Sequence, residues 1–239
     1  LNRMSRYKAI ILPILEEEGV PPELFYLAMI ESGLNPKAYS YAHASGVWQF
    51  ISSTGKMYGL KKNWWVDERR DIEKATHAAA RLLKNLHNEF DDWYLAFAAY
   101  NCGSTRVRKT IKRQGTNDYW KLTRLPPQTR NYVANIMAAI FISNNPAKYG
   151  FAVVKEKKME WNIVEIDKAV SLQVISECAK LDPIILQNYN PELKQGTIPP
   201  IEKGKPYSFK MPINASPKFD SLFAEVEIEK FQEILFLEH

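Results

Sequence analysis

The chain lacks the sequence features of several common classes of protein. Basic blocks with interleaved aromatic residues are absent, and no long uninterrupted run of Lys or Arg occurs, so we expect no nucleic acid partner. No apolar stretch is long enough to cross a membrane. The net charge of +5 and the pI near 9.0 suit any polyanion, including nucleic acid or an acidic cell-wall polymer, without selecting one. With 46% hydrophobic residues in 239 positions, the chain can fill one large core or two smaller ones.

Cysteine is scarce, and the common motifs for metal and nucleotide binding are missing. Cys102 and Cys178 show no ligand spacing, and we expect each to be a small buried residue, with a single disulfide in an oxidising compartment left open. His43, His77 and His87 have no metal-binding spacing, and P-loop, dinucleotide-binding and nucleophile-elbow motifs are absent. We therefore expect neither a metal ion nor a cofactor.

The two ends of the chain say little about the fold. The sequence starts at Leu1 without Met, which indicates an internal start, so the signal for any lipid anchor would lie upstream. Leu237, Glu238 and His239 look like the beginning of an affinity tag and are left out of the reasoning. The compartment must therefore be inferred from the function.

Helical periodicity dominates the first 150 residues. In the clearest segment Ala75, Ala79, Leu83 and Leu86 share one face, and Asp71 is a natural N-cap in front of it. The loops between these segments carry polar and aromatic residues, as loops that build a binding cleft often do. We expect helices near 6–18, 22–32, 47–58, 72–90, 93–100, 104–114 and 129–144.

The composition changes after residue 145. Strand-like segments occur at 153–154, 163–166 and 207–211. Two short helical patterns lie between the second and third of these segments. Asp182 and Pro183 separate the two patterns and suit the N-cap and the first position of the second helix. We expect a small strand-helix-helix-strand unit that packs on the helical part because it is short for independent folding. Residues 219–236 have the composition of a further helix, whose register the sequence leaves open.

Glu31 is the most informative residue, because it is the only charge between Leu24 and Lys37. Leu24, Leu27, Ala28 and Glu31 share one helical stripe, and Gly33 follows as a stop signal. A carboxyl in apolar surroundings loses solvation of its charged form, which raises its pKa. A raised pKa suits a general acid near neutral pH, whereas the alternative is a buried glutamate that ties down a helix end.

Four segments occur in an order and spacing that is similar to one enzyme family. They are E-S with N-P at 31–36, S-G-V-W-Q-F at 45–50, A-Y-N-C-G at 99–103 and L-P-P-Q-T-R-N-Y-V at 125–133. Together they resemble the lysozyme-like lytic transglycosylases of peptidoglycan, within them the membrane-bound lytic murein transglycosylase D group. The segment after them resembles a divergent LysM module, a carbohydrate-binding unit.

The resemblance implies a role for individual residues of this chain. Glu31 matches the catalytic acid and base of the family, and Ser40 stands where a serine lies near that glutamate. Gln49 matches a glutamine that lines the cleft. The resemblance also places Trp48, Tyr100, Asn101 and Tyr132 at the substrate. At the position of Trp48, next to Gln49, the family has a different apolar residue. The tyrosine that matches Tyr132 lies near the catalytic carboxyl in the family.

The resemblance implies a mainly α, lysozyme-like catalytic domain of the goose-type or soluble lytic transglycosylase kind at 1–150. A small α+β LysM-like module at 151–215 and a tail at 216–239 follow. It also implies that Glu31 alone cleaves the glycan strands of peptidoglycan and leaves 1,6-anhydromuramoyl ends. The enzyme is then expected to act as a monomer in the bacterial envelope or periplasm. Asp67, Glu68 and Asp71 are better interpreted as caps and surface ion pairs than as a second catalytic carboxylate. A muramidase-type hydrolase and a non-catalytic glycan-binding protein are the alternatives.

Overall fold

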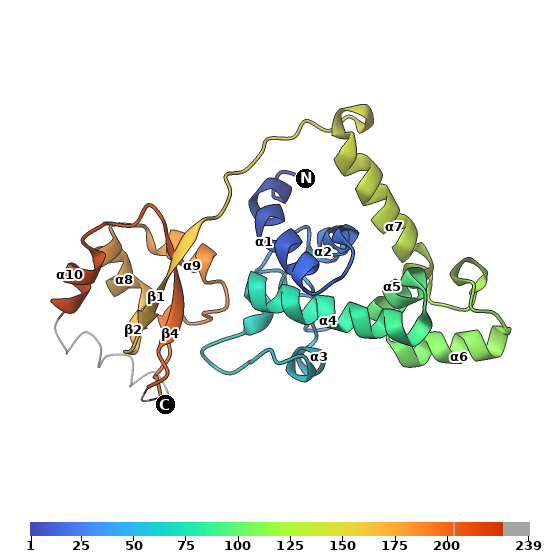
Figure 1. Cartoon of the computed structure of the whole chain (residues 1–239), viewed down its shortest axis with the longest axis horizontal. Coiled ribbons are helices and arrows are strands. Elements are labelled where there is room, and N and C mark those ends of the chain that lie inside the picture. Colours follow the sequence, from blue (N-terminus) through green and yellow to red (C-terminus); the bar gives the residue numbers. More distant parts are fainter. Residues whose placement is uncertain (203, 227–239) are drawn as a thin grey trace.

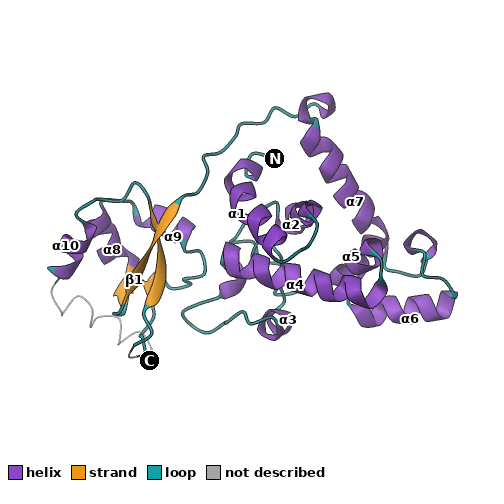
Figure 2. Ribbon diagram, viewed as in Figure 1, coloured by secondary structure: helices purple, strands orange, loops and turns teal. Residues whose placement is uncertain are grey.

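The computed structural model describes residues 1–202 and 204–226 and contains two units (Figure 1). Helices make up the first unit, whereas the second combines short strands with helices (Figure 2). An extended connector leaves the first unit after residue 149 and runs past the N-terminus to the first strand. Its backbone is tied to the N-terminal helix, because the Glu156 N–H donates to the carbonyl of Asn2 and the Ser5 hydroxyl donates to the carbonyl of Glu156.

The helices of the first unit follow the sequence pattern closely. They are α1 (Met4–Glu17), α2 (Phe25–Ser32), α3 (Ser52–Met57), α4 (Ile72–Phe90), α5 (Trp93–Cys102), α6 (Ser104–Gln114) and α7 (Pro127–Asn144), with short 3-10 turns at η1 (Pro22–Leu24), η2 (Glu68–Arg70), η3 (Tyr119–Lys121) and η4 (Pro146–Tyr149). The helix expected at 47–58 is wrong over its first five residues and begins only at Ser52. The backbone turns before it, because Gln49 adopts a left-handed φ of 49°.

Helix α4 lies at the centre of the first unit and packs against α1 and α5. Its predicted apolar face is buried, with Ala79 and Leu83 fully covered. The Asp71 carboxylate accepts hydrogen bonds from the N–H groups of Glu73 and Lys74 at 2.9 and 3.0 Å, as predicted for an N-cap. Such a cap stabilises a helix by about 1 kcal/mol. Helix α4 is thus a rigid base on which the surrounding loops rest.

The second unit has the predicted order of strand, two helices and strand. It consists of β1 (Trp161–Ile166), β2 (Val170–Ser171), α8 (Leu172–Ala179), α9 (Pro183–Tyr189), β3 (Thr197–Ile198), β4 (Tyr207–Pro212) and α10 (Phe219–Ala224). β1 pairs antiparallel with β4, with Trp161 opposite Pro212, and β2 pairs antiparallel with β3. The Asp182 side chain caps α9 by accepting from the Ile184 N–H at 2.7 Å.

Three expectations about this second half need correction or lie beyond the structure. Val153 and Val154 form no strand and lie in the exposed connector, since no neighbouring strand is there to pair with them. The helix expected from residue 219 ends at Ala224 and is followed by a turn at 225–226; residues 227–236 lie outside the described residues, as do the three C-terminal residues. Cys178 is buried in the second unit whereas Cys102 ends α5 in the first, so the two thiols belong to different units.

The two units share a buried polar contact. The Lys210 ammonium of β4 lies 2.6 Å from the Asp71 carboxylate at the start of α4, and their side chains are only 7% and 4% exposed. Burial and the charge of Asp71 raise the pKa of the nearby Glu192 carboxyl to about 7. The Tyr207 hydroxyl donates to this carboxyl at 2.7 Å. The predicted packing of the second unit on the first is therefore present, through ionised groups as well as apolar ones.

Among the helices that the structure describes, none combines the length and the hydrophobicity that spanning a bilayer requires.

Candidate active site

Glu31 occupies the last turn of α2, where the helix ends. Gly33 adopts a left-handed φ of 60° and its N–H donates to the Met29 carbonyl, which terminates the helix as the sequence predicts. The Glu31 carboxyl is largely enclosed. Burial raises its pKa above the ordinary value, and a hydrogen bond from Tyr132 opposes part of this rise. A carboxyl whose pKa is raised by burial is better suited to give a proton to a leaving group near neutral pH.

Tyr132 of α7 donates its hydroxyl hydrogen bond directly to Oε1 of Glu31. Its side chain is only 3% exposed, and burial together with the Glu31 charge raises the pKa of the phenol well above its ordinary value. Tyr132 therefore stays protonated and acts as a fixed donor. The proximity of Tyr132 to the carboxyl, which the resemblance implied, is present although the two residues are 101 positions apart.

Tyr100 and Asn101 lie at the end of α5. The charge of Glu31 is a cause, after burial, of the raised pKa of the Tyr100 phenol, which places Tyr100 near the carboxyl. The Tyr100 hydroxyl donates to the Trp48 carbonyl at 2.6 Å. Asn101 accepts a hydrogen bond from the Thr129 hydroxyl at 2.7 Å, which ties α5 to α7. Both side chains thus hold elements together around Glu31.

Ser40 and Gln49 lie in one loop, residues 38–50, here called the site loop. The Ser40 hydroxyl accepts from the Ala44 N–H at 3.1 Å. The Gln49 amide donates to the Gly46 carbonyl at 2.8 Å and to the Ala38 carbonyl at 3.4 Å. The structure therefore gives both side chains a part in ordering the loop, and a contact with substrate stays a prediction for each.

The site loop is anchored next to Glu31. The Ser32 hydroxyl, one residue further along α2, donates to the Val47 carbonyl at 2.8 Å. Together with the bond from Tyr100 to Trp48, it fixes two successive carbonyls of the loop, one to α2, which carries the acid, and one to α5. Ser32 belonged to a recognised motif, but its anchoring role was not predicted, because a serine at a helix end carries no signal of a partner 15 positions away.

The expectation that Trp48 lines the substrate site is wrong for its side chain. The indole is 0% exposed, and its N–H donates to the Thr76 hydroxyl of α4 at 2.9 Å. Aromatic side chains occur both in protein cores and in the walls of clefts. The sequence alone could therefore not tell which of the two places Trp48 occupies. Among other aromatic residues of the first 150 positions, Trp64 and Tyr94 are exposed and Trp65 is buried.

The other acidic residues near the motifs are committed to caps and ion pairs, as the sequence favoured, but they are buried and do not lie on the surface. Asp67 pairs with Arg69, Glu68 pairs with Lys74, and Asp71 caps α4. Within the described residues no carboxylate contributes to the pKa of Glu31, and no group of three metal-ligating side chains is found. Glu31 is accordingly an isolated acid.

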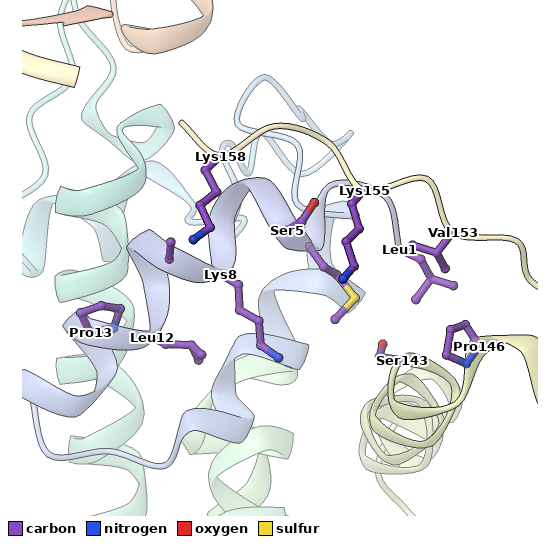
Figure 3. Close-up of a pocket in the computed structure, with 12 residues that line it drawn as sticks. Leu1, Ser5, Lys8, Leu12, Pro13, Ser143, Pro146, Val153, Lys155 and Lys158 are labelled. Carbon is purple, nitrogen blue, oxygen red and sulfur yellow. The ribbon is translucent and has the colours of Figure 1, made fainter. Parts of the chain in front are cut away.

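A cavity of about 720 Å³ lies elsewhere in the first unit, between α1, the end of α7 and the connector (Figure 3). Apolar side chains such as Leu12 and Val153 line it, and Lys8, Lys155 and Lys158 surround it. In the described part of the chain none of the predicted site residues lines this cavity, so we do not assign the active site to it.

Comparison with known proteins agrees with this arrangement. Residues 9–123 match the family described as Transglycosylase SLT domain, and residues 161–228 match the Lytic transglycosylase MltD, LysM-like domain. Membrane-bound lytic murein transglycosylase D of Escherichia coli strain K12 is 34% identical over 202 residues, covering 82% of this chain and 44% of the relative. The chain thus spans less than half the length of that relative.

Two further matches each cover about three fifths of the chain. Peptidoglycan transglycosylase gp16 of Escherichia phage T7 is 30% identical over 140 residues, which is 57% of this chain and 10% of that protein. An inactive mutant of lytic transglycosylase Slt from Pseudomonas aeruginosa has a similar fold, with a TM-score of 0.50 and 24% identity over 61% of this chain and 25% of that one. The chain therefore belongs to the lytic transglycosylases that combine an SLT domain with a LysM-like domain.

Proposed function

We propose that this protein cleaves the β-1,4 bond between N-acetylmuramic acid and N-acetylglucosamine in peptidoglycan, with Glu31 as acid and then base. The observation that carries the proposal is the isolated, enclosed Glu31 carboxyl, whose pKa is raised by burial and which receives a hydrogen bond from Tyr132. We further propose residues 1–150 as the catalytic domain, 151–215 as the LysM-like module and 216–239 as a tail whose helix α10 packs on that module.

The proposed reaction has two proton transfers through one carboxyl. Glu31 first donates its proton to the bridging oxygen, so that the bond between this oxygen and C1 of the muramoyl residue breaks. The Glu31 carboxylate then takes the proton of the C6 hydroxyl as O6 forms a bond to the same C1. The N-acetyl carbonyl of the sugar can assist by attacking C1 in between, as in substrate-assisted glycosidases. A 1,6-anhydro end results, no water is consumed, and Glu31 is protonated again.

The isolation of Glu31 favours this reaction over hydrolysis. A water-dependent glycosidase of the usual kind needs a second carboxylate as base or nucleophile. The nearby candidates Asp67, Glu68 and Asp71 are held in ion pairs and a helix cap instead. A non-catalytic glycan-binding protein would have no need of a carboxyl with a raised pKa, so we place this alternative last.

The products of purified peptidoglycan, analysed by mass spectrometry, test the proposal. We expect anhydromuramoyl ends, which are lighter than reducing ends by one water molecule. Reducing ends would show a hydrolase of the same fold. The absence of any cleavage product, with glycan binding retained, would favour the non-catalytic alternative.

Tyr132→Phe is expected to change the pH dependence of cleavage. The Tyr132 hydrogen bond lowers the pKa of Glu31, so its removal should raise that pKa further. The first step needs protonated Glu31, and the loss of kcat/KM at high pH should therefore move to higher pH in the variant. We expect a rate about tenfold lower at the optimum, because the carboxyl loses its positioning partner. A pH profile with an unmoved basic limb would contradict this role.

Peptidoglycan lies outside the bacterial cytoplasm, so we propose an envelope location, in the periplasm, with glycan strands as the partner and a monomer as the working form. The name of the Escherichia coli relative, which places that protein at a membrane, supports this location.

A further inference from the structure

Residues 61–71, here called the bridging loop, belong to the first unit in sequence but to both units in packing. Trp65 and Val66 are buried in the core of the second unit, among side chains of its strands and helices. The backbone joins in as well. The Asp67 N–H donates to the Glu192 carbonyl at 2.9 Å, and the Lys194 N–H donates to the Trp65 carbonyl at 2.8 Å. The LysM-like unit thus determines where this loop lies.

Two side chains of the LysM-like unit add further tethers. The Lys194 ammonium donates to the Asn63 carbonyl at 2.8 Å, and the Gln195 amide donates to the Trp64 carbonyl at 3.1 Å. Both acceptors are backbone atoms of the bridging loop. The tethers therefore fix the path of the loop itself.

The bridging loop contacts the site loop through the Arg70 guanidinium, which donates to the Ser45 hydroxyl at 3.2 Å, and through the Arg69 backbone, which lies against Gly46.

A buried ion pair between Arg69 and Asp67 adds a further link. Arg69 is 1% exposed and Asp67 is 2% exposed, and two guanidinium nitrogens, Nε and Nη2, donate to the Asp67 carboxylate at 2.8 and 2.7 Å. Although burial alone would raise it, the pKa of Asp67 is lowered by the Arg69 hydrogen bonds and charge, so the pair is ionised. The third nitrogen, Nη1, donates to the carbonyls of His43 and Phe50 in the site loop at 2.8 and 2.7 Å.

These two carbonyls lie beside the strained positions of the site loop. His43 and Gln49 have left-handed φ values of 59° and 49°, which non-glycine residues adopt only where the surroundings enforce them. The cost of such a residue and the gain from a charge-assisted hydrogen bond are of the same order. The Arg69 guanidinium therefore supplies stabilisation of the size needed to hold Gln49 in its observed conformation.

We propose that the LysM-like unit positions the site loop for substrate, and that Asp67 and Arg69 are the positioning residues through which it acts. The inference rests on the proposed function in one respect, since it takes the site loop with Ser40 and Gln49 to contact the glycan. The path runs from the LysM-like unit to the bridging loop, through the ion pair, and into the site loop. None of the contacts named for this path is made by the Glu31 carboxyl itself, so we expect the main effect of the path on substrate binding and not on proton transfer.

Amide hydrogen exchange measures the coupling without any substrate. In the site loop the Ser45 N–H donates to the Phe50 carbonyl and the Gly46 N–H donates to the Ala38 carbonyl, both at 3.0 Å. We expect these amides to exchange about tenfold faster in the double variant Lys194→Ala/Gln195→Ala, which removes both side-chain tethers.

A matched double variant serves as the control. Lys205→Ala/Gln173→Ala removes the same two residue types from the same unit, but Lys205 bonds to Glu202 and Gln173 bonds to Glu177, within that unit. We expect unchanged exchange in the site loop of this control. Faster exchange in the control as well would show general loosening of the unit and would overturn the proposed path.

Arg69→Lys tests the ion pair in the reaction. Lysine keeps the positive charge but cannot hold a carboxylate with two nitrogens and two carbonyls with a third. We expect KM for glycan to rise about tenfold with kcat within about twofold, and the pH limb assigned to Glu31 to stay in place. A fall in kcat alone, with KM unchanged, would contradict a positioning role.

The two hypotheses fail separately. Unchanged exchange of the site-loop amides in both Arg69→Lys and Lys194→Ala/Gln195→Ala overturns the positioning role, whatever the enzyme does to glycan. Faster exchange in a protein that cleaves no peptidoglycan supports the positioning of the loop and rejects only the proposed reaction.

Discussion

Glu31→Gln is expected to slow the release of anhydro products from peptidoglycan by about a thousandfold or more. Positioned acid-base catalysis contributes about 10² to 10⁴ to a rate, and here one carboxyl performs both proton transfers, so no other group can cover for its loss. Glutamine keeps the size of the side chain and an oxygen that can accept the Tyr132 hydrogen bond. Initial rates of product release, measured by mass spectrometry against the unaltered protein, give the effect. A rate within tenfold of the unaltered protein would show that Glu31 is not the acid.

The stability of the same variant separates lost chemistry from lost structure. Because burial raises the pKa of Glu31 in the fold, the folded state binds this proton more tightly than the unfolded state does. The favourable contribution of protonated Glu31 is complete below its unfolded pKa and is lost as the pH rises through its raised folded pKa. Glu31→Gln lacks this loss, so the change in its free energy of unfolding between pH 4 and pH 8 should be less unfavourable than that of the unaltered protein. Urea unfolding at the two pH values measures the difference, which isolates Glu31 since every other group titrates in both proteins.

Gly46→Ala is expected to lower the free energy of unfolding by about 3 kcal/mol or more, because two costs combine at this position. Gly46 has a left-handed φ of 84°, and a Cβ built on it would lie 1.7 Å from the carbonyl oxygen of Arg69. The obstacle is backbone of the bridging loop, which cannot rotate away as a side chain would. Urea unfolding of the variant measures the loss.

Gly59→Ala is the matched control for Gly46→Ala. Gly59 has almost the same φ, 86°, but no atom lies within 4 Å of the position a Cβ would take. It should lose only the cost of the left-handed conformation, about 1 kcal/mol. An equal loss of unfolding free energy in the two variants would mean that the site loop and the bridging loop can move apart at no cost. That result would contradict a tight contact between Gly46 and Arg69.

Local sequence signals predicted the elements whose causes are local. The helices at 72–90 and 104–114 have the predicted bounds, since an N-cap at Asp71 and a stop at Gly115 lie within a few residues of their ends. Glu31 could be recognised because a lone charge in an apolar helix is informative without any knowledge of its neighbours. The burial of Trp48 could not be predicted from its local sequence, because the partner of its indole, Thr76, lies 28 positions away.

The bridging loop shows where prediction from sequence ended. Asp67 and Arg69 looked like members of a polar surface loop, and nothing in their spacing indicates that both are almost fully buried. Their burial depends on Trp65 and Val66 entering a core formed by residues more than 95 positions later. A pattern read over 10 or 20 residues carries no information about such a contact.

The insertion of Trp65 and Val66 into the second core also limits how the domains of such a protein can be recombined with domains of other proteins. A crossover in the connector would join the helical unit to a foreign module that offers no recess for an indole and an isopropyl group. The two apolar side chains would then face water and favour self-association. A compatible chimera must take residues 64–67 from the same protein as its LysM-like module. The set of residues that must be exchanged together therefore differs from the domain boundary that the connector marks in the sequence.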